Sequence, residues 1–292
     1  MPKTLRETSK SLVNRLLGPL GLEVRRRQNP PPPPPVIADP VEAMSRVRAG
    51  DRVALECPLT QCVVYNGLSF GPEAWHPFVA LLKERASRTG HRYEGSVLER
   101  YYAAWQPANG REALLVAPDG PRLLERYSAL LMHVPWMELS PDERLAFTRR
   151  VIEIENSCFG QKGLGVEHGY SLHGPVSAVK GALEYQRLVE LLESIQVGGY
   201  DRTRGDITAQ VLKRGPEYRF RILHGQHRVA VLAHLGYRNV AVVPQMLVLP
   251  EEVEHWPQVH RGVWNTDEAL RYFNHHFDFD SHGWATRLGL AN

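Results

Sequence analysis

The sequence has 292 residues, of which 43% are hydrophobic and 23% are charged. These proportions are typical of a soluble globular protein, and the length leaves room for two modest domains. No stretch approaches the roughly 20 consecutive apolar residues of a membrane-spanning helix, and the N-terminus lacks the apolar core and cleavage site of a secretory signal. We therefore expect a cytoplasmic protein.

The formal net charge of +3 is distributed unevenly along the chain. Residues 1–29 have seven basic and two acidic side chains, a net of +5, which leaves about −2 for the rest of the chain. A body with that charge is a poor candidate for strong nucleic-acid binding, which requires many basic contacts with phosphates.

The three cysteines, Cys57, Cys62 and Cys158, form an odd and sparse set. Such a set provides neither a disulfide framework nor a complete zinc site. We expect buried thiols in a reducing compartment.

The N-terminal segment is predicted to be a basic amphipathic arm over residues 1–29, joined to the body by a proline-rich linker over residues 30–40. Leucines at helical spacing indicate a helix in the arm, and Pro30 to Pro35 favour a stiff polyproline II spacer. The arm is suited to docking on a membrane surface or a protein partner; the alternative is a weakly ordered tail. Arm and spacer resemble the attachment segments of proteins that act beside cell-envelope polysaccharide machinery, which implies a place at the inner face of the membrane.

Residues 41–159 are predicted to form a first α/β domain whose role the sequence does not indicate. Ser96 and Ser140, each followed three residues later by Glu, are typical starts of helices. The expected elements are strands at 52–55 and 62–65 and helices at 75–86, 96–105 and 141–155.

Residues 160–250 are predicted to form a second, small mixed-sheet domain, followed by a C-terminal extension over residues 251–292. The fold class is therefore α/β (α+β). The expected elements are a helix at 177–196, strands at 206–212 and 218–223, a helix from 226 or 227 to 235, and a strand at 240–243.

A candidate phosphate site lies at the predicted turn between strand and helix, His224-Gly225-Gln226-His227-Arg228. The first turn of a helix presents free backbone N–H groups and the positive end of the helix dipole. Gly225 allows a phosphate to approach the backbone, and Arg228 can hold phosphate oxygens with a planar fork. His224 and His227 are candidate catalytic residues, because histidine can donate or accept a proton near neutral pH.

The short motifs on either side of this turn occur in a defined order over about 65 residues. Ser194-Ile195 with Gly198 is followed by Ile207 and Tyr218-Arg219, then by the glycine turn, Leu235-Gly236 and a valine-rich strand. In this order the segment resembles the ParB/sulfiredoxin-like superfamily. The resemblance implies a nucleotide-binding domain that takes a nucleoside triphosphate or diphosphate, with ATP or ADP favoured and CTP as the alternative, together with Mg²⁺.

Three departures from the patterns of superfamily members limit which activity is expected. Sulfiredoxins have a cysteine where this chain has Gln226, which argues against sulfinic-acid repair. Free-serine kinases of the superfamily usually have Asp where this chain has His224. Partition proteins continue into a helix-turn-helix domain, whereas residues 251–292 show no such pattern.

A second group of charged residues precedes the turn. Lys180, Glu184 and Arg187 are spaced so that one side of the helix presents all three. Lys180 and Arg187 are candidate phosphate ligands, and Glu184 is a candidate base or metal contact, with Asp206 and Glu217 as further carboxylates. The alternative is a solvated ladder of charges.

The C-terminal extension contains a dense cluster of histidines and carboxylates between Asn274 and His282. These residue types can bind a divalent metal, but their spacing matches no zinc motif. The alternating Phe277 and Phe279 favour a docked terminal segment instead.

Three functions remain open from the sequence. The first is an enzyme, an ATP- or ADP-dependent phosphotransferase that acts on a small hydroxylated substrate. The second is a nucleotide-sensing adaptor without turnover, docked by residues 1–29. The third and weakest is a CTP-dependent DNA-partition or nuclease-type protein.

Overall fold

The computed structural model describes residues 32–87, 92–116, 119–158 and 163–291. The chain divides into two units, Met1–Pro33 and Pro34–Asn292. The arm predicted over residues 1–29 lies outside the described residues.

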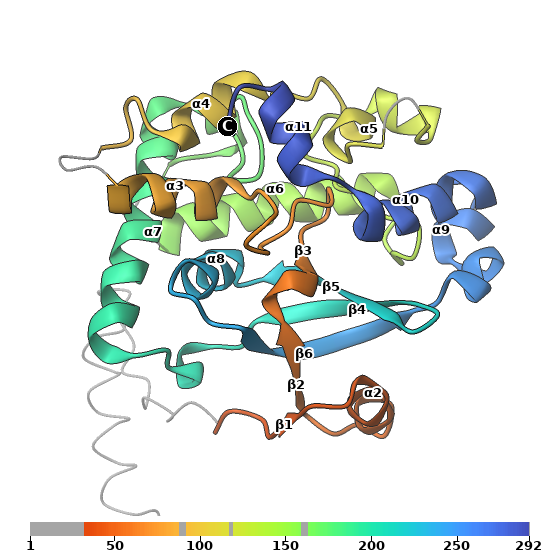
Figure 1. The fold of residues 1–292 in the computed structure, drawn as a ribbon. Coiled ribbons are helices and arrows are strands. Elements are labelled where there is room, and N and C mark those ends of the chain that lie inside the picture. Colours follow the sequence, from red (N-terminus) through yellow and green to blue (C-terminus); the bar gives the residue numbers. More distant parts are fainter. Residues whose placement is uncertain (1–31, 88–91, 117–118, 159–162, 292) are drawn as a thin grey trace, which may run out of the picture. The chain divides into compact units, whose positions relative to one another are not determined.

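A mixed sheet runs through the second unit, and its order within the described residues is β1-β2-β6-β4-β5-β3 (Figure 1). The β2–β6 and β4–β5 pairs are antiparallel, while the other neighbouring pairs are parallel. This arrangement confirms the predicted α/β class. The strands are β1 (Val36–Ile37), β2 (Ala54–Pro58), β3 (Cys62–Val63), β4 (Thr208–Arg214), β5 (Glu217–His224) and β6 (Asn239–Val248).

The sheet joins the two regions that the sequence analysis treats as separate domains. Strand β2 pairs with β6, and β3 pairs with β5, so strands from residues 41–159 flank those from 160–250 on both sides. Residues 34–292 accordingly form one compact unit. The boundary expected near residue 160 therefore does not coincide with a break between compact units.

In Figure 1 most of the helices lie toward the β3 and β5 edge of the sheet, while α2 lies beside β1 at the opposite edge. Several begin where the sequence predicts, because Ser96 and Ser177 accept hydrogen bonds from the backbone N–H groups three residues ahead. The helices are α2 (Pro40–Arg48), α3 (Pro77–Ser87), α4 (Val97–Ala104), α5 (Gly110–Ala113), α6 (Pro141–Cys158), α7 (Ala178–Gly198), α8 (Gln226–His234), α9 (Pro257–His260), α10 (Thr266–Asp278) and α11 (Ser281–Arg287).

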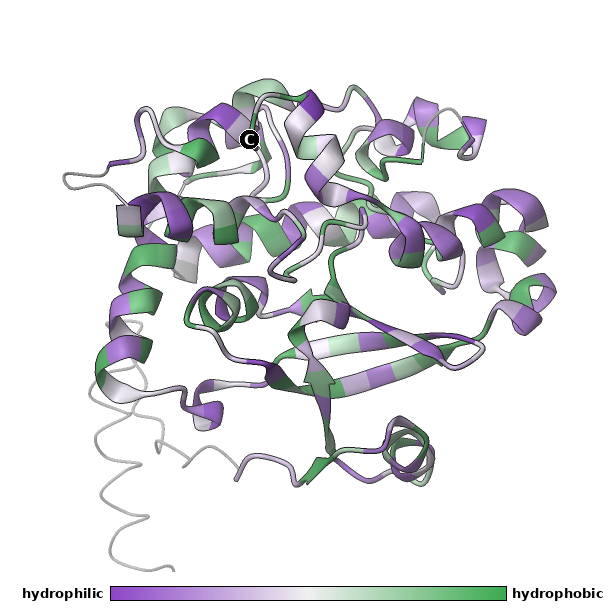
Figure 2. Ribbon diagram, viewed as in Figure 1, coloured by the Kyte–Doolittle hydropathy of each residue, from purple (hydrophilic) through white to green (hydrophobic). Residues whose placement is uncertain are grey.

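Two hydrophobic cores pack against the sheet, because successive residues of a strand point to opposite faces. Val211 and Phe220 belong to the core that also contains residues of α3, α7 and α8. Leu212 belongs to a second core with residues of α10. The alternation of apolar and polar residues along β4 and β5 is visible in Figure 2.

The C-terminal extension is helical and contributes to the second core. Tyr272 and Phe273 of α10 are fully buried there, so the extension is docked on the body. The thiols of Cys57 and Cys62 are also buried, as predicted, and burial raises the pKa of both. Among the helices described, none combines the length and apolarity needed to cross a membrane.

Candidate functional site

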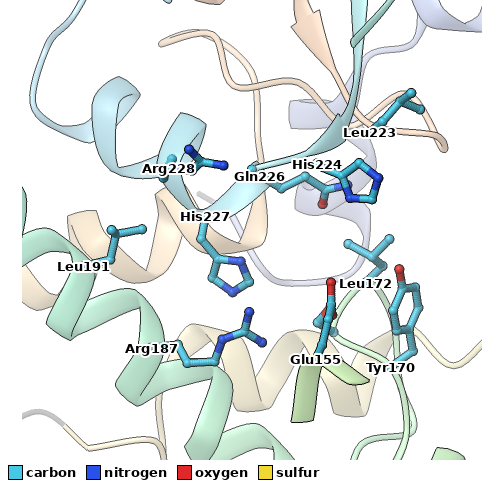
Figure 3. Close-up of a pocket in the computed structure, with 12 residues that line it drawn as sticks. Glu155, Tyr170, Leu172, Arg187, Leu191, Leu223, His224, Gln226, His227 and Arg228 are labelled. Carbon is cyan, nitrogen blue, oxygen red and sulfur yellow. The ribbon is translucent and has the colours of Figure 1, made fainter. Parts of the chain in front are cut away.

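A pocket of about 330 Å³ opens where β5 ends and α8 begins. In Figure 3 the His227 ring and the Arg187 guanidinium lie on one side of it, and Glu155, Tyr170 and His224 lie on the other. The walls come from α6, α7, the end of β5, the first turn of α8 and the loop before α7. The full lining is Glu155, Tyr170, Ser171, Leu172, Arg187, Leu191, Leu223, His224, Gly225, Gln226, His227 and Arg228.

Gly225 makes the turn between the strand and the helix possible. Its φ of 89° lies in the left-handed region, and a Cβ at this position would lie 2.9 Å from Cγ1 of Ile207. Gly225 also occupies the N-cap position of α8, where no side chain caps the helix. The backbone N–H groups of the first turn have no partner within the helix by geometry. The start of α8 therefore offers donors and a positive dipole end to an anion in the pocket.

Arg228 lines this pocket but has a structural role as well. Its guanidinium donates to the carbonyl oxygen of Gly205 and, at 2.8 Å, to that of Asp206. These bonds tie α8 to the loop that precedes β4. The sequence analysis interpreted Arg228 as a phosphate ligand and did not anticipate these two hydrogen bonds, which occupy two of its donor nitrogens.

Glu184 is the centre of a buried network beneath the pocket. Its Oε1 accepts from Nζ of Lys180 at 2.5 Å and from Nη1 of Arg187 at 2.7 Å, and its Oε2 lies 2.8 Å from Nε2 of His227. Nζ of Lys180 also donates to Oδ1 of Asn156 at 2.5 Å. One carboxylate thus faces three basic groups from two helices.

The charge state of Glu184 follows from these contacts. Burial alone would raise the pKa of this carboxyl, but the hydrogen bond from His227 and the positive charges of Arg187 and Lys180 hold its pKa well below the ordinary value. Glu184 is therefore an anion at neutral pH, and Lys180 and Arg187 together exceed its charge.

The His227 ring is fixed on two sides. It stacks on Phe78, with 4.4 Å between ring centroids, and its Nε2 faces the ionised Glu184, so Nε2 is the protonated nitrogen of the neutral ring. Nδ1 of His227 makes no hydrogen bond with any residue that the structure describes. A neutral ring held in this way can accept a proton at Nδ1.

Six of the predicted site residues are brought together in one pocket. His224 is the exposed last residue of β5, and Gln226 is the first residue of α8. Oε1 of Gln226 is buried and lacks a hydrogen-bond partner. The six residues are Arg187, His224, Gly225, Gln226, His227 and Arg228.

Lys180 and Glu184 do not line the pocket. Their side chains are 1% and 0% exposed, so a solvated ladder of charges is wrong. The ammonium of Lys180 is enclosed by Glu184 and Asn156, and its role as a phosphate ligand stays a prediction. Glu184 can position His227 but does not reach the pocket surface.

The other carboxylates considered from the sequence lie elsewhere. Asp206 pairs with Arg52 at 2.6 Å, and Glu217 pairs with Arg214 at 3.0 Å. Neither lines the pocket. Each carboxylate is paired with an arginine, although the backbone carbonyl of Asp206 accepts from Arg228 in the first turn of α8.

Sequence reasoning missed Glu155 and Tyr170, which also line the pocket. Glu155 lies in the last turn of α6, where an acidic residue opposes the helix dipole. That local conflict is a signal of function that the sequence contains. Tyr170 follows a glycine-rich loop and shows no comparable signal; burial, followed by the charge of Glu155, raises its pKa.

The histidines and carboxylates of the C-terminal extension do not form a metal site. His275 bonds the carbonyl oxygen of Asn66 at 2.8 Å, and Asp278 pairs with Arg214 at 2.8 Å. His276 is buried, and burial lowers its pKa. In the described parts of the chain, no group of three or more His, Cys, Asp or Glu side chains is arranged to hold a metal ion.

No protein-family model, curated protein or solved structure matched this chain. The interpretation of the pocket therefore depends on its own geometry.

Proposed function

We propose that the pocket at the start of α8 binds the phosphate groups of a nucleoside triphosphate or diphosphate, and that the protein transfers phosphate to a small hydroxylated substrate. The observation that carries this proposal is the uncapped first turn of α8, which opens behind the left-handed Gly225 onto the pocket. Backbone donors and a helix dipole at such a position favour an anion.

The charge around the pocket supports binding of an anion. Arg187 lines the wall, and Lys180 lies beneath it, while Glu184 supplies a single negative charge between them. The Arg187 side chain is 13% exposed, so its charge acts in a partly water-excluded region, where electrostatic attraction is stronger than at the surface. A phosphate placed against the first turn of α8 would be close to this charge.

His227 supplies the base that phosphate transfer to a hydroxyl requires. The hydroxyl oxygen of the substrate would form a bond to phosphorus as the bond between phosphorus and the leaving phosphate oxygen breaks. Nδ1 of His227 would take the hydroxyl proton, and Glu184 would stabilise the resulting imidazolium through Nε2. Glu184 is then a positioning residue.

Glu155 fits a role in holding Mg²⁺ with the nucleotide. Of the residues that line this pocket, it is the acidic one. Mg²⁺ commonly binds one or two carboxylates together with substrate phosphates, so a lone carboxylate is sufficient where phosphate oxygens complete the shell. The ion would neutralise charge on the phosphates.

The order of elements supports the proposed relation to the ParB/sulfiredoxin-like superfamily. Helix α7, strands β4 and β5, helix α8 and strand β6 follow one another as that resemblance implies. The glycine turn lies between β5 and α8, where nucleotide phosphates are expected. We favour ATP or ADP, with CTP as the alternative.

A second candidate function is a nucleotide sensor without turnover. The observation that favours it is the pair of hydrogen bonds from the Arg228 guanidinium to the carbonyl oxygens of Gly205 and Asp206. An anion that competes for Arg228 would release the loop before β4, which links occupancy of the pocket to the conformation of a neighbouring segment.

The test is a calorimetric titration of ATP, ADP, CTP and GTP, with and without Mg²⁺, into the wild type and Gln226→Glu. An acid in the first turn of a helix is tolerated or stabilising by about 0.3–1 kcal/mol, so the variant should fold. Its carboxylate would repel phosphate, and we expect nucleotide affinity to fall at least about tenfold. Gln196→Glu, an exposed site on α7, is the matched control and should bind normally.

Absence of binding by the wild type to all four nucleotides would refute the proposal. Binding with phosphate release or transfer supports the enzyme, and His227→Gln should then abolish turnover but retain binding. Binding without loss of phosphate, in the presence of hydroxylated acceptors, supports the sensor instead.

A further inference from the structure

A second cavity, of about 210 Å³, adjoins the phosphate pocket. It lies against the face of β4 and β5 that presents Gln210 and Arg221, and α6 covers it through Arg144, Phe147 and Val151. It shares part of its wall with the phosphate pocket. The shared residues are Glu155, Tyr170, Leu172, Leu223, His224 and Gln226.

Arg221 brings a buried positive charge to this cavity. The residue is 5% exposed, and its Nε and Nη2 donate to Oε1 of Gln210 at 3.0 and 2.5 Å. Its guanidinium carbon lies 5.8 Å from the ring centroid of Trp136. Among the described residues, no carboxylate forms an ion pair with Arg221, and its Nη1 has no hydrogen-bond partner.

Arg144 adds a second cation to the same cavity. Its guanidinium packs against the Phe147 ring at 5.3 Å, and it too has no ion-pair partner among the described residues. Burial lowers the pKa of both arginines, that of Arg221 to about 10, and the charge of Arg144 lowers the pKa of Arg221 further. Both remain charged at neutral pH, so two like charges face one enclosed space.

Three polar atoms around the cavity are buried without a partner. They are Oη of Tyr65, Nε of Arg144 and Oε1 of Gln226. Buried polar groups in folded proteins are nearly always hydrogen-bonded, and exceptions indicate a water, an ion or a ligand. Two unpartnered donors and two arginines that form no ion pair among the described residues, against the single carboxylate of Glu155 in the same lining, indicate an anion.

We propose that this cavity binds a small organic acid, with its carboxylate on Arg221, Arg144 and Tyr65 and its apolar body against Met132 and Met137. A guanidinium fork matches the planar carboxylate, and the phenolic O–H of Tyr65 supplies a third donor. The apolar wall and the small volume fit an aromatic or short aliphatic acid better than a hydrated phosphate.

The shared wall places this acid beside the phosphate pocket. A hydroxyl on the acid would lie near Glu155 and His224, at the junction of the two cavities. Its assignment as the phosphate acceptor rests on the proposed function, whereas its binding does not.

The experiment is calorimetry with benzoate and, as the neutral isostere, benzamide, carried out without nucleotide. We expect benzoate to bind and benzamide to bind at least about tenfold more weakly, because only the carboxylate compensates the arginines. Equal affinity for the two, or no binding of benzoate, would overturn the proposal. Inorganic phosphate that binds in place of benzoate would also overturn it.

Two variants test whether benzoate binds in this cavity. Arg221→Met should weaken benzoate roughly 10- to 100-fold, yet its thermal midpoint without ligand should be unchanged or higher, because an uncompensated buried charge is removed. Tyr65→Phe breaks no hydrogen bond and should fold normally while it also weakens benzoate. Arg219→Met, on the same strand but outside the cavity, is the control.

Benzoate affinity unchanged in both Arg221→Met and Tyr65→Phe would contradict the proposed position of the acid. Nucleotide binding that fails while benzoate binding persists would remove the proposed function and leave this inference intact.

Discussion

At the scale of single residues, Glu184 determines how the basic groups around the pocket are arranged. Its two oxygens receive Lys180, Arg187 and His227, and its side chain is fully enclosed. The spacing of Lys180, Glu184 and Arg187 on one face of the helix is evident in the sequence. Their burial is not, because it requires α7 to lie against other segments, including the one that contains Asn156.

We predict that Glu184→Gln lowers the free energy of unfolding by about 3–5 kcal/mol, because it leaves Lys180 and Arg187 without their carboxylate in the interior. Urea denaturation measures the change. Glu190→Gln, an exposed position on the same helix, should change stability by less than about 0.5 kcal/mol. Similar losses of stability in the two variants would show that the buried network of Glu184 does not contribute to the free energy of unfolding.

At the scale of elements, α8 is defined at both ends by glycines with positive φ. Gly225 precedes its first residue with φ 89°, and Gly236 follows its end with φ 79°. The two differ in their surroundings, since a Cβ on Gly225 meets Ile207 at 2.9 Å whereas a Cβ on Gly236 meets nothing within 4 Å. They form a natural pair for comparison.

We expect Gly236→Ala to lower the free energy of unfolding by about 1–2 kcal/mol, the cost of placing a residue with a Cβ in the left-handed backbone conformation. Gly225→Ala should cost about 1–3 kcal/mol more, because the added methyl group forces the turn to move. Thermal or urea unfolding gives both values. Nucleotide affinity should fall in Gly225→Ala and stay unchanged in Gly236→Ala. The opposite result would show that the turn at Gly225 is not part of the nucleotide-binding site.

Strand β6 shows where element prediction from sequence stopped short. The sequence predicts a strand at 240–243. Pro244 follows it directly, and a proline cannot donate in a ladder. The strand continues to Val248. Pro244 is accommodated at a register shift between β4 and β6, where Ala209 pairs with Pro244 and Gln210 with Met246. The neighbouring strand therefore decided the length of β6.

At the scale of the whole molecule, buried histidines link the stability of the fold to pH. Burial, with a smaller contribution from His227, lowers the pKa of His76 to about 3, and burial lowers that of His133 to about 4. The unfolded chain, with a histidine pKa of about 6.5, therefore binds protons that the folded chain excludes. Stability is lost as the pH falls below about 6.5 and is fully present above it.

We predict that His76→Asn makes the loss of stability between pH 6.5 and 5 less steep, by up to about 1.4 kcal/mol per pH unit. Asparagine can still accept the bond that Nδ1 of His76 receives from the backbone of Phe78. Urea denaturation at a series of pH values measures the slope. His282→Asn, at an exposed position, should leave it unchanged, and equal slopes in all three proteins would contradict the prediction.

The sequence by itself determined the α/β class, the positions of helices α3, α4, α6, α7 and α8 and of strands β2 to β6, and the turn from His224 to Arg228. These depend on local chemistry, such as the serine caps, the period of apolar residues and the glycine that a left-handed turn requires. Only the tertiary structure decided which residues share a cavity. Tyr65, Arg221 and the α6 residues Arg144 and Glu155 come from three distant parts of the sequence. They meet because one sheet takes strands from both halves of the chain and α6 crosses its face. The same packing buried Lys180 and Glu184. The spacing of residues in a sequence shows which of them share a helix face, but only the tertiary structure shows which segments pack against that face.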